Sequence, residues 1–290
     1  MKDIGPKDIE NNFPLVSRRD GREGGETSTV RVGDVEIGGE KLCVMAGPCT
    51  IENLDQLRDI ASHVKDSGAV LLRGGAYKPM TFPYRSETAF ELGEEGLAFM
   101  RRVRDETGLP LVTEVVDVRL VDQVAETADM IQVGARNMQN FPLLEELGRC
   151  GKPVLLKRHF GCGIRDWLGA AEYLYYHGND QVVLCERGVS AAHTHEPTAR
   201  FIVDIQAIPA VQSYSHLPIV IDPSHATFNR KFVPSISRAA IAAGADGLIL
   251  EVHPTPEKAA VDPLQALSYE VFDGLMGDLR GIARVVGKTL

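Results

Sequence analysis

The segment KLCVMAGP at residues 41–48 is a short apolar run that ends in Gly-Pro, and seven further short apolar runs follow it. They are AVLLRGGA (69–76), PLVTEV (110–115), MIQVGA (130–135), PVLLKR (153–158), QVVLCERG (181–188), PIVIDPSHA (218–226) and GLILEVHP (247–254). Their apolar parts are continuous rather than alternating, which is typical of strands in a parallel sheet that is covered on both faces. The sequence therefore predicts eight buried parallel strands.

Segments with a helical period lie between these runs. The clearest are Leu54 to Ser67, Leu97 to Thr107, Ile164 to His177, Ile236 to Ala243 and, after the last strand, Tyr269 to Val286. Eight strands that alternate with helices predict a closed (β/α)8 barrel, or TIM barrel. An open doubly wound sheet is the alternative. The sequence lacks GxGxxG after the first strand and lacks a P-loop, so nothing local supports nucleotide binding.

The N-terminal part of the chain predicts a small addition to the barrel. Thr29 to Gly38 alternates apolar and polar residues around a Gly-Asp turn, which indicates a β-hairpin. We expect this hairpin to cap the barrel floor. Residues 1–27 are then a polar leader, and residues 28–290 form one barrel domain.

Composition limits the classes of function. The formal net charge of -9 argues against a nucleic-acid partner or an anionic membrane surface and favours a small polar substrate. Since the chain has neither a signal-peptide core nor a membrane-spanning run, we expect a soluble cytoplasmic protein. Its five cysteines lack CxxC spacing, so they are expected to be reduced.

In a (β/α)8 barrel the active site lies at the carboxyl ends of the strands, so polar residues there are candidates for chemistry. One group found there is cationic: Arg73, Lys78, Arg136, Lys157 and Arg187. Each alone is most simply a solvated surface cation. Because five cations at one barrel mouth would repel one another, they are expected to require a multiply charged anion that offsets the repulsion, and a phosphate plus a carboxylate would suit.

A second group combines a thiol, an imidazole and two carboxylates: Cys49, His225, Glu251 and Asp262. These ligand types suit Mn, Fe, Co or Zn better than Ca or Mg, and a divalent ion there would act as a Lewis acid. A buried thiol, a hydrogen-bonded histidine and ion-paired acids are the alternative interpretation.

The motifs at the strand ends also resemble those of a known family. AGPCTIE, LRGGAYKP, TEVVD, QVGARNMQN, LLKR, CERG, DPSHAT and EVHP with a downstream Asp are similar to the motifs of short, type I beta DAHP synthases and, more distantly, KDO8P synthases. The resemblance extends from the first strand nearly to the C-terminus. It implies condensation of phosphoenolpyruvate with a sugar aldehyde, which gives a 3-deoxy-2-ketoulosonate and inorganic phosphate.

The resemblance also implies residue roles. Cys49, His225, Glu251 and Asp262 would ligate the metal; Arg136 and Lys157 would bind the phosphate of phosphoenolpyruvate; Arg73, Lys78, Lys157 and Arg187 would bind its carboxylate. Lys78, Glu114 and His225 are the predicted catalytic residues. Cys49, where metal-independent KDO8P synthases have Asn, favours the metal-dependent branch of the family.

The implied mechanism starts when the metal polarises the aldehyde and C3 of phosphoenolpyruvate attacks it. Water then adds at C2, and phosphate leaves by carbon–oxygen cleavage. We expect Glu114 to stabilise the developing positive charge and orient the water, and Lys78 to protonate the new alkoxide.

The predicted acceptor site departs from the family pattern. Its residues are Pro79, Met80, Thr81, Arg158, His159 and Asp262. The family's KPRT reads KPMT at 78–81, which replaces a phosphate-binding arginine, and its KRGMSAT reads KRHFGCG at 157–163, which removes a serine. The second substrate is therefore the least determined part of the prediction.

Two acceptors remain open. Erythrose 4-phosphate, the family's ordinary acceptor, requires Arg85 or His159 to supply the missing charge. An unphosphorylated aldehyde of specialised metabolism would instead suit an apolar pocket of Met80, Phe82 and Phe160. We favour erythrose 4-phosphate on family membership. A catalytically inactive barrel with a binding or regulatory role is a third interpretation.

Regulation and assembly are expected to be simple. The leader is too short for the ferredoxin-like or ACT-type domain of some relatives, and no chorismate mutase follows the last helix. We therefore expect no feedback through a fused domain. Relatives of this kind are commonly homodimers or homotetramers, and we expect a homodimer or homotetramer here.

Overall fold

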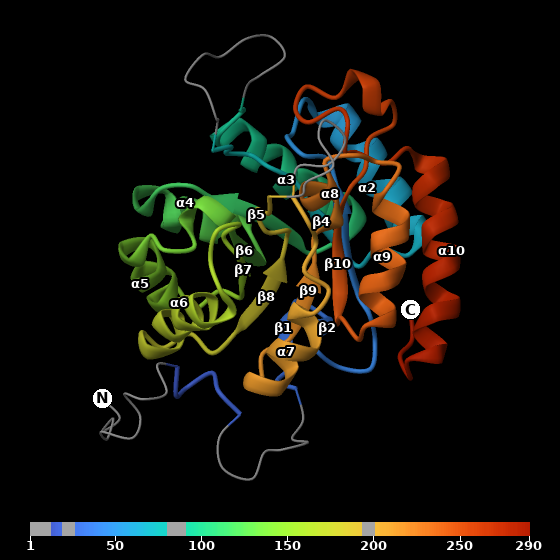
Figure 1. The fold of residues 1–290 in the computed structure, drawn as a ribbon. Helices are drawn as coiled ribbons and strands as arrows, with labels where there is room; N and C mark the ends of the chain where they lie inside the picture. The colour runs from blue at the N-terminus through green and yellow to red at the C-terminus, as the bar shows by residue number, and fades with distance from the viewer. Residues whose placement is uncertain (1–12, 19–26, 80–90, 193–200) are drawn as a thin grey trace.

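A computed structural model describes residues 13–18, 27–79, 91–192 and 201–290. In this part of the chain, parallel strands close into an eight-stranded barrel surrounded by helices, as predicted (Figure 1). Each strand pairs with the next along the chain, and the last pairs with the first. The barrel strands are β3 (Cys43–Gly47), β4 (Leu71–Arg73), β5 (Leu111–Val115), β6 (Met130–Val133), β7 (Val154–Lys157), β8 (Val182–Glu186), β9 (Ile219–Ile221) and β10 (Gly247–Glu251).

Both faces of the barrel strands are buried, which explains their continuous apolar sequences. In β7, Leu155 belongs to the interior cluster, whereas Leu156 packs in the outer layer with the helices. The next two residues keep this alternation, because side chains along a strand point to opposite faces. Lys157 therefore points into the barrel and Arg158 away from it.

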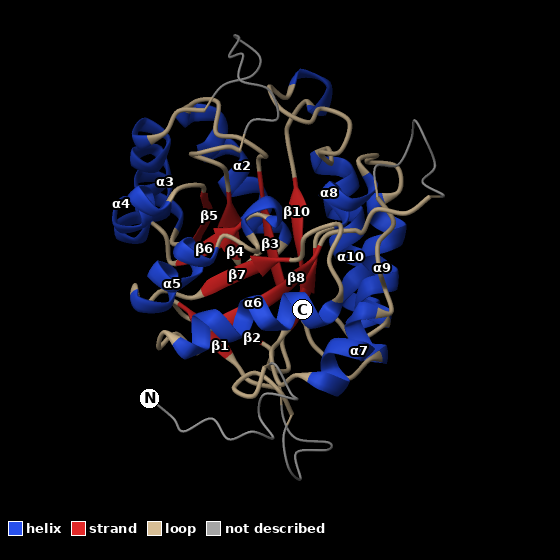
Figure 2. Cartoon of the chain, turned by 60° about the vertical axis from the view of Figure 1, so that its left-hand side comes forward, coloured by secondary structure: helices blue, strands red, loops and turns tan. Residues whose placement is uncertain are grey.

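Helices cover the outside of the barrel, which lies at the centre of Figure 2. They are α2 (Leu54–Ser67), α3 (Glu94–Thr107), α4 (Val121–Thr127), α5 (Phe141–Arg149), α6 (Ile164–Tyr176), α7 (Ala207–Tyr214), α9 (Val233–Ala242) and α10 (Tyr269–Val285). The short helix α8 (Pro223–Thr227) instead begins at the carboxyl end of β9. Short 3-10 turns occupy η1 (Val118–Leu120), η2 (Ala135–Asn137) and η3 (Pro256–Lys258). In α2, Asn53 caps the first turn through Gln56 N, and left-handed Gly68 ends the helix.

Two predicted helix starts were wrong by three residues. Helix α3 begins at Glu94 rather than Leu97, because its first turn is acidic and shows no apolar period. Helix α9 begins at Val233 rather than Ile236, because the proline in its first turn is tolerated where no helical N–H bond is needed.

The predicted hairpin forms from β1 (Val30–Val32) and β2 (Val35–Ile37). Its apolar side chains join the interior cluster of the barrel. A Cβ at Gly33 or Gly38 would approach Pro110 or Pro218, the residues that precede β5 and β9. The hairpin therefore plugs the amino-terminal end of the barrel, opposite the candidate site.

Part of the predicted leader is packed against the body of the molecule. Val16 is fully buried, and the N–H groups of Leu15 and Val16 donate to the Glu172 carboxylate on α6. Ser215 Oγ donates to Val16 O at 2.6 Å. Residues 13–18 belong to the predicted leader, yet they pack against the predicted barrel domain. The boundary predicted at residue 27 therefore does not separate two structurally independent parts here.

Among the helices in the four described ranges, none is both long and apolar enough to cross a bilayer.

Candidate active site

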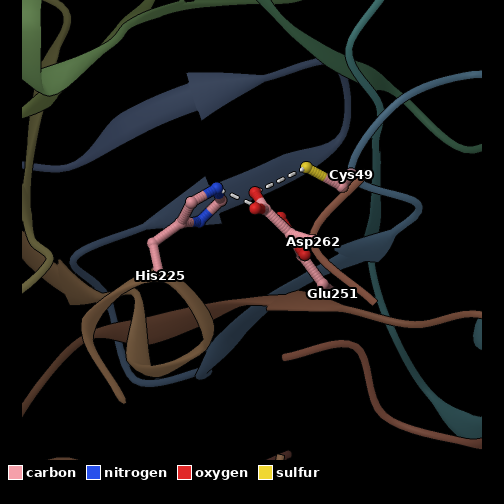
Figure 3. Close-up of side chains that lie close together, drawn as sticks. All are labelled: Cys49, His225, Glu251 and Asp262. Atoms are coloured by element: carbon pink, nitrogen blue, oxygen red, sulfur yellow. Dashed lines mark hydrogen bonds and ion pairs between the residues drawn. The ribbon is translucent and has the colours of Figure 1, made fainter. Parts of the chain in front are cut away.

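Cys49, His225, Glu251 and Asp262 converge at the carboxyl end of the barrel (Figure 3). One donor atom from each lies within 4.8 Å of every other donor atom. Cys49 follows β3, His225 lies on α8, Glu251 ends β10, and Asp262 belongs to the loop after β10. His225 Nε2 lies 3.1 Å from Glu251 Oε1, and Cys49 Sγ lies 3.6 Å from Asp262 Oδ2.

His225 is oriented by Asp222, the residue that caps α8. Asp222 Oδ1 accepts the backbone N–H of His225 at 3.0 Å, and Asp222 Oδ2 lies 2.7 Å from His225 Nδ1. Because Nδ1 faces this carboxylate, Nε2 is directed at Glu251. Cys49, His225, Glu251 and Asp262 are called the donor group below. Burial raises the pKa of Asp222, but the charges of His225 and Lys157 outweigh it and hold that pKa well below its usual range.

Asp222 also links the donor group to the cationic group. Lys157 Nζ donates to Asp222 Oδ2 at 2.6 Å, and both side chains are almost completely buried. One carboxylate oxygen thus contacts a predicted metal ligand and a predicted phosphate ligand. The sequence placed Asp222 at a strand end but indicated no role for it.

Two side chains donate hydrogen bonds to the Glu251 carboxylate, in addition to its contact with His225. Arg73 Nη1 donates to Glu251 Oε1 at 3.2 Å, and Gln265 Nε2 donates to Glu251 Oε2 at 2.8 Å. Burial raises the pKa of Glu251, but His225, Arg73 and Lys78 outweigh it, so the pKa is lowered. Gln265 was not predicted, because no motif or strand end marks it.

Cys49 has a cationic neighbour. Lys78 Nζ lies 3.1 Å from Cys49 Sγ and 3.4 Å from the Cys49 carbonyl oxygen. Burial raises the pKa of the Cys49 thiol well above its usual value, and Glu251 and Asp262 act in the same direction. A thiolate at this position would therefore require additional positive charge nearby.

The residues present fit a divalent transition metal. One sulfur, one imidazole nitrogen and two carboxylate oxygens point at a common centre, and this donor set suits a borderline-soft ion. An ion there would supply the positive charge that the Cys49 thiolate requires. The prediction that these four residues are metal ligands is compatible with the geometry and stays a prediction.

Carboxylates lie among the cations of the barrel mouth. Arg73 and Lys157 are buried against Glu251 and Asp222, so their charges are offset before any ligand binds. The expectation that only a bound anion could offset the repulsion was therefore too strong. Arg187 is also buried, with Nη2 donating to His225 O at 3.3 Å, whereas Arg136 is exposed on η2.

Glu114 lies on β5 inside the barrel and is buried. Its Oε2 accepts from Gln132 Nε2 at 2.9 Å, and its Oε1 is buried without a hydrogen-bond partner among the described residues. A Cβ at Gly134 would lie 2.1 Å from Oε1, so the carboxylate requires glycine at this position, directly after β6. The Oε1 atom is thus positioned to accept from a small ligand such as water.

The predicted acceptor residues are only partly described. Met80 and Thr81 lie outside the described residues, as do Phe82 and Arg85, whereas Pro79 is half-buried. Arg158 points away from the barrel interior and pairs with Glu186 at 3.3 Å and Asp204 at 2.9 Å. Its role in acceptor binding stays a prediction, although two carboxylates already engage its guanidinium.

An aromatic cluster lies beside Arg187. The ring of Phe160 packs on His159 with centroids 4.1 Å apart and on Phe201 at 5.2 Å. The Arg187 guanidinium carbon lies 4.4 Å from the Phe201 ring centroid, which is a cation–π contact. The sequence indicated Phe160 as an apolar residue of this region but did not indicate Phe201.

Comparison with known proteins gives consistent matches along the chain. A family model described as the DAHP synthetase I family matches residues 17–282. A phospho-2-dehydro-3-deoxyheptonate aldolase of Thermotoga maritima is 45% identical over 262 residues, which are 90% of this chain and 76% of that protein. A 2-dehydro-3-deoxyphosphooctonate aldolase of Syntrophotalea carbinolica is 31% identical over 275 residues, which are 89% of this chain and 97% of that protein.

Solved structures agree with these matches. The crystal structure of a DAHP synthase from Thermotoga maritima has a TM-score of 0.87 and 44% identity, and it covers 95% of this chain and 77% of that chain. A truncated form of 3-deoxy-D-arabino-heptulosonate 7-phosphate synthase from the same organism has a TM-score of 0.85 and 43% identity. The match covers 96% of this chain and 99% of that chain.

Proposed function

This chain belongs to the DAHP synthetase I family, and we propose that it condenses phosphoenolpyruvate with a phosphorylated sugar aldehyde. Erythrose 4-phosphate is the acceptor that we assign, with DAHP and inorganic phosphate as products. The observation that carries this proposal is the junction of two groups at Asp222. Asp222 contacts His225, which belongs to the candidate metal site, and buried Lys157, which is assigned to phosphoenolpyruvate.

The proposed cofactor is a divalent ion, Mn, Fe, Co or Zn, held by the four donors. Bound there, it supplies Lewis acidity toward the aldehyde oxygen. The protein contributes the orientation of the donors: Asp222 directs His225 Nε2, and Arg73 and Gln265 hold the two oxygens of Glu251. Preorganised donors of this kind reduce the cost of ordering the site during turnover.

Phosphoenolpyruvate is assigned to the cationic side of the barrel mouth. Buried Lys157 provides a point charge for its phosphate, and Arg73 and Arg187 provide planar guanidinium groups for its carboxylate. Arg136 is exposed at the rim, where it can reach the phosphate from the solvent side. Both guanidinium groups are held by protein contacts, which lowers the entropy lost on binding.

The proton transfer and the orientation of water are assigned to Lys78 and Glu114. Lys78 is held beside Cys49; burial lowers its pKa, but Cys49, in its thiolate form, and Glu114 outweigh burial and raise that pKa. It can therefore donate a proton to the alkoxide that forms when C3 of phosphoenolpyruvate attacks the aldehyde. Glu114 Oε1, which has no hydrogen-bond partner among the described residues, would orient the water that adds at C2 before phosphate leaves.

A second acceptor class is favoured by one observation. His159, Phe160 and Phe201 form a partly exposed aromatic surface next to Arg187, which would suit an acceptor with an apolar end. The alternative function is the same phosphoenolpyruvate chemistry with an unphosphorylated aldehyde.

The test is a phosphate-release assay with phosphoenolpyruvate and a panel of aldehydes, with added Mn2+ and with excess chelator. Erythrose 4-phosphate should have the highest kcat/KM, and chelator should abolish turnover. A higher kcat/KM for an unphosphorylated aldehyde would establish the alternative. Absence of phosphate release with every aldehyde would support the inactive barrel instead.

A Met80→Arg variant tests the acceptor end directly. If the family's phosphate contact has been lost, the new arginine should lower KM for phosphorylated aldehydes and leave KM for phosphoenolpyruvate unchanged. Unchanged KM values for every phosphorylated aldehyde would show that the acceptor loop has a different arrangement.

A further inference from the structure

Asp262 differs from the other three donors because it lies in the loop that follows β10, eleven positions after Glu251. Its backbone has φ of 53°, the left-handed region that non-glycine residues seldom adopt. A ligand on an irregular loop contributes to a metal site only if the loop is held in place. The contacts of this loop therefore decide whether Asp262 completes the donor group.

Glu52 holds the loop near its end. This residue lies three positions after Cys49, just before α2, and its side chain is 16% exposed. Glu52 Oε1 accepts the backbone N–H of Ala260 at 2.9 Å, two residues before Asp262. Gln56 Nε2, in the first turn of α2, donates to Glu52 Oε2 at 3.1 Å and holds the second oxygen of the carboxylate.

His253 holds the beginning of the same loop. It is 3% exposed, and its Nδ1 accepts the backbone N–H of Thr255 at 3.0 Å. A neutral imidazole that accepts at Nδ1 carries its proton on Nε2. That Nε2 faces the carboxylate oxygen that also binds Ala260, at 3.3 Å from Glu52 Oε1, and it lies 3.0 Å from Gln56 Nε2.

One carboxylate oxygen thus ties both ends of the loop to the segment that carries Cys49. We propose that Glu52, supported by His253, is a positioning residue that holds Asp262 within reach of the metal. Neither side chain belongs to the donor group, and both act through the backbone of the loop. This inference rests on the metal site of the proposed function and adds the part of the chain that assembles it.

The first test measures Mn2+ binding to the purified protein by EPR of the free ion. Glu52→Ala should weaken Mn2+ binding by at least about 10-fold, the low end of the usual effect of losing an outer-shell partner. Glu52→Gln should bind more tightly than Glu52→Ala, because its amide oxygen can still accept from Ala260 N. Equal Mn2+ affinity of Glu52→Ala and the unmodified protein would overturn the inference.

The matched control is Asp129→Ala. Asp129 Oδ2 also accepts a backbone N–H, that of Leu111 at 2.8 Å, but at the opposite end of the barrel. Its loss should lower thermal stability and leave Mn2+ affinity unchanged. If Asp129→Ala weakens Mn2+ binding as much as Glu52→Ala does, general destabilisation explains both, and the inference fails.

A double-mutant cycle separates positioning from general damage. In an Asp262→Ala background, Glu52→Ala should change Mn2+ affinity by less than about 2-fold, because the ligand that Glu52 positions is already gone. Independent losses that multiply would overturn the inference. If the unmodified protein binds no Mn2+, the metal proposal itself fails, which is a different outcome from Mn2+ binding that does not depend on Glu52.

Discussion

Asp222→Asn is the most informative single substitution, because Asp222 contacts both halves of the candidate site. Asparagine keeps the size of the side chain and an oxygen that can accept the His225 backbone N–H. It replaces the other oxygen, which accepts from Lys157 Nζ at 2.6 Å and faces His225 Nδ1 at 2.7 Å. An amide NH2 there would oppose the lysine ammonium.

The magnitude follows from the burial of the pair. Lys157 and Asp222 have 4% and 1% exposed side chains, so water cannot replace the lost carboxylate. Removing one partner of a buried ion pair costs about 3–5 kcal/mol. We expect Asp222→Asn to lower the free energy of unfolding by about 3–5 kcal/mol in the absence of both the divalent metal and phosphoenolpyruvate.

Binding should change together with stability. Without Asp222, His225 is no longer fixed with Nε2 toward Glu251, and loss of such a partner weakens metal binding by about 10- to 100-fold. The assays are urea unfolding, Mn2+ titration by EPR, and KM for phosphoenolpyruvate. Mn2+ affinity and KM equal to those of the unmodified protein would refute the role of Asp222 as the junction.

Asp246→Asn is the control for this prediction. Asp246 is also buried, accepts the Ile219 N–H at 2.9 Å and pairs with Lys288 at 2.8 Å, but at the floor of the barrel. It should reduce stability and leave Mn2+ affinity unchanged.

Three further predictions concern single residues. Cys49→Ala removes one of four donors and should abolish tight Mn2+ binding and turnover; full activity of this variant in excess chelator would contradict metal dependence. Phe201→Leu removes the ring under the Arg187 guanidinium, and loss of about 0.5–1 kcal/mol of cation–π attraction should raise KM for phosphoenolpyruvate by about 2- to 5-fold. Phe201→Tyr keeps the ring and serves as its control, so equal KM values for the two variants would refute the contact. Ile37→Ala in the hairpin should lower the free energy of unfolding by about 2–5 kcal/mol in urea and leave KM unchanged, because Ile37 is buried at the barrel floor. A changed KM of Ile37→Ala with an unchanged free energy of unfolding would contradict the placement of Ile37 at the barrel floor.

The fold could be predicted because its signals are local. Eight apolar runs that end in polar motifs require strands covered on both faces, and the Gly-Asp turn near residue 33 requires a hairpin. Helix starts were less accurate at α3 and α9, because polar first turns and an early proline show no apolar period.

The candidate donors could also be found from strand ends, because parallel strands bring their carboxyl ends to one edge. What each donor contacts could not be found in this way. The pairing of Lys157 with Asp222, 65 residues apart, depends on how β7, β8 and β9 are staggered in the closed barrel. Sequence period separates Lys157 from Arg158 but does not indicate which carboxylate each one meets.

The sequence by itself thus determined the barrel, the hairpin and the residue types available at the barrel mouth. These features depend on the period of apolar residues and on the identity of single residues at the strand ends. Only the tertiary structure decided which groups share a hydrogen bond, as in the contact of the Glu52 carboxylate with the backbone N–H of Ala260, 208 residues away. The physical reason is that hydrogen bonds and ion pairs require atoms to meet within about 3 Å. Distances of that size between remote segments are set by the packing of the whole barrel.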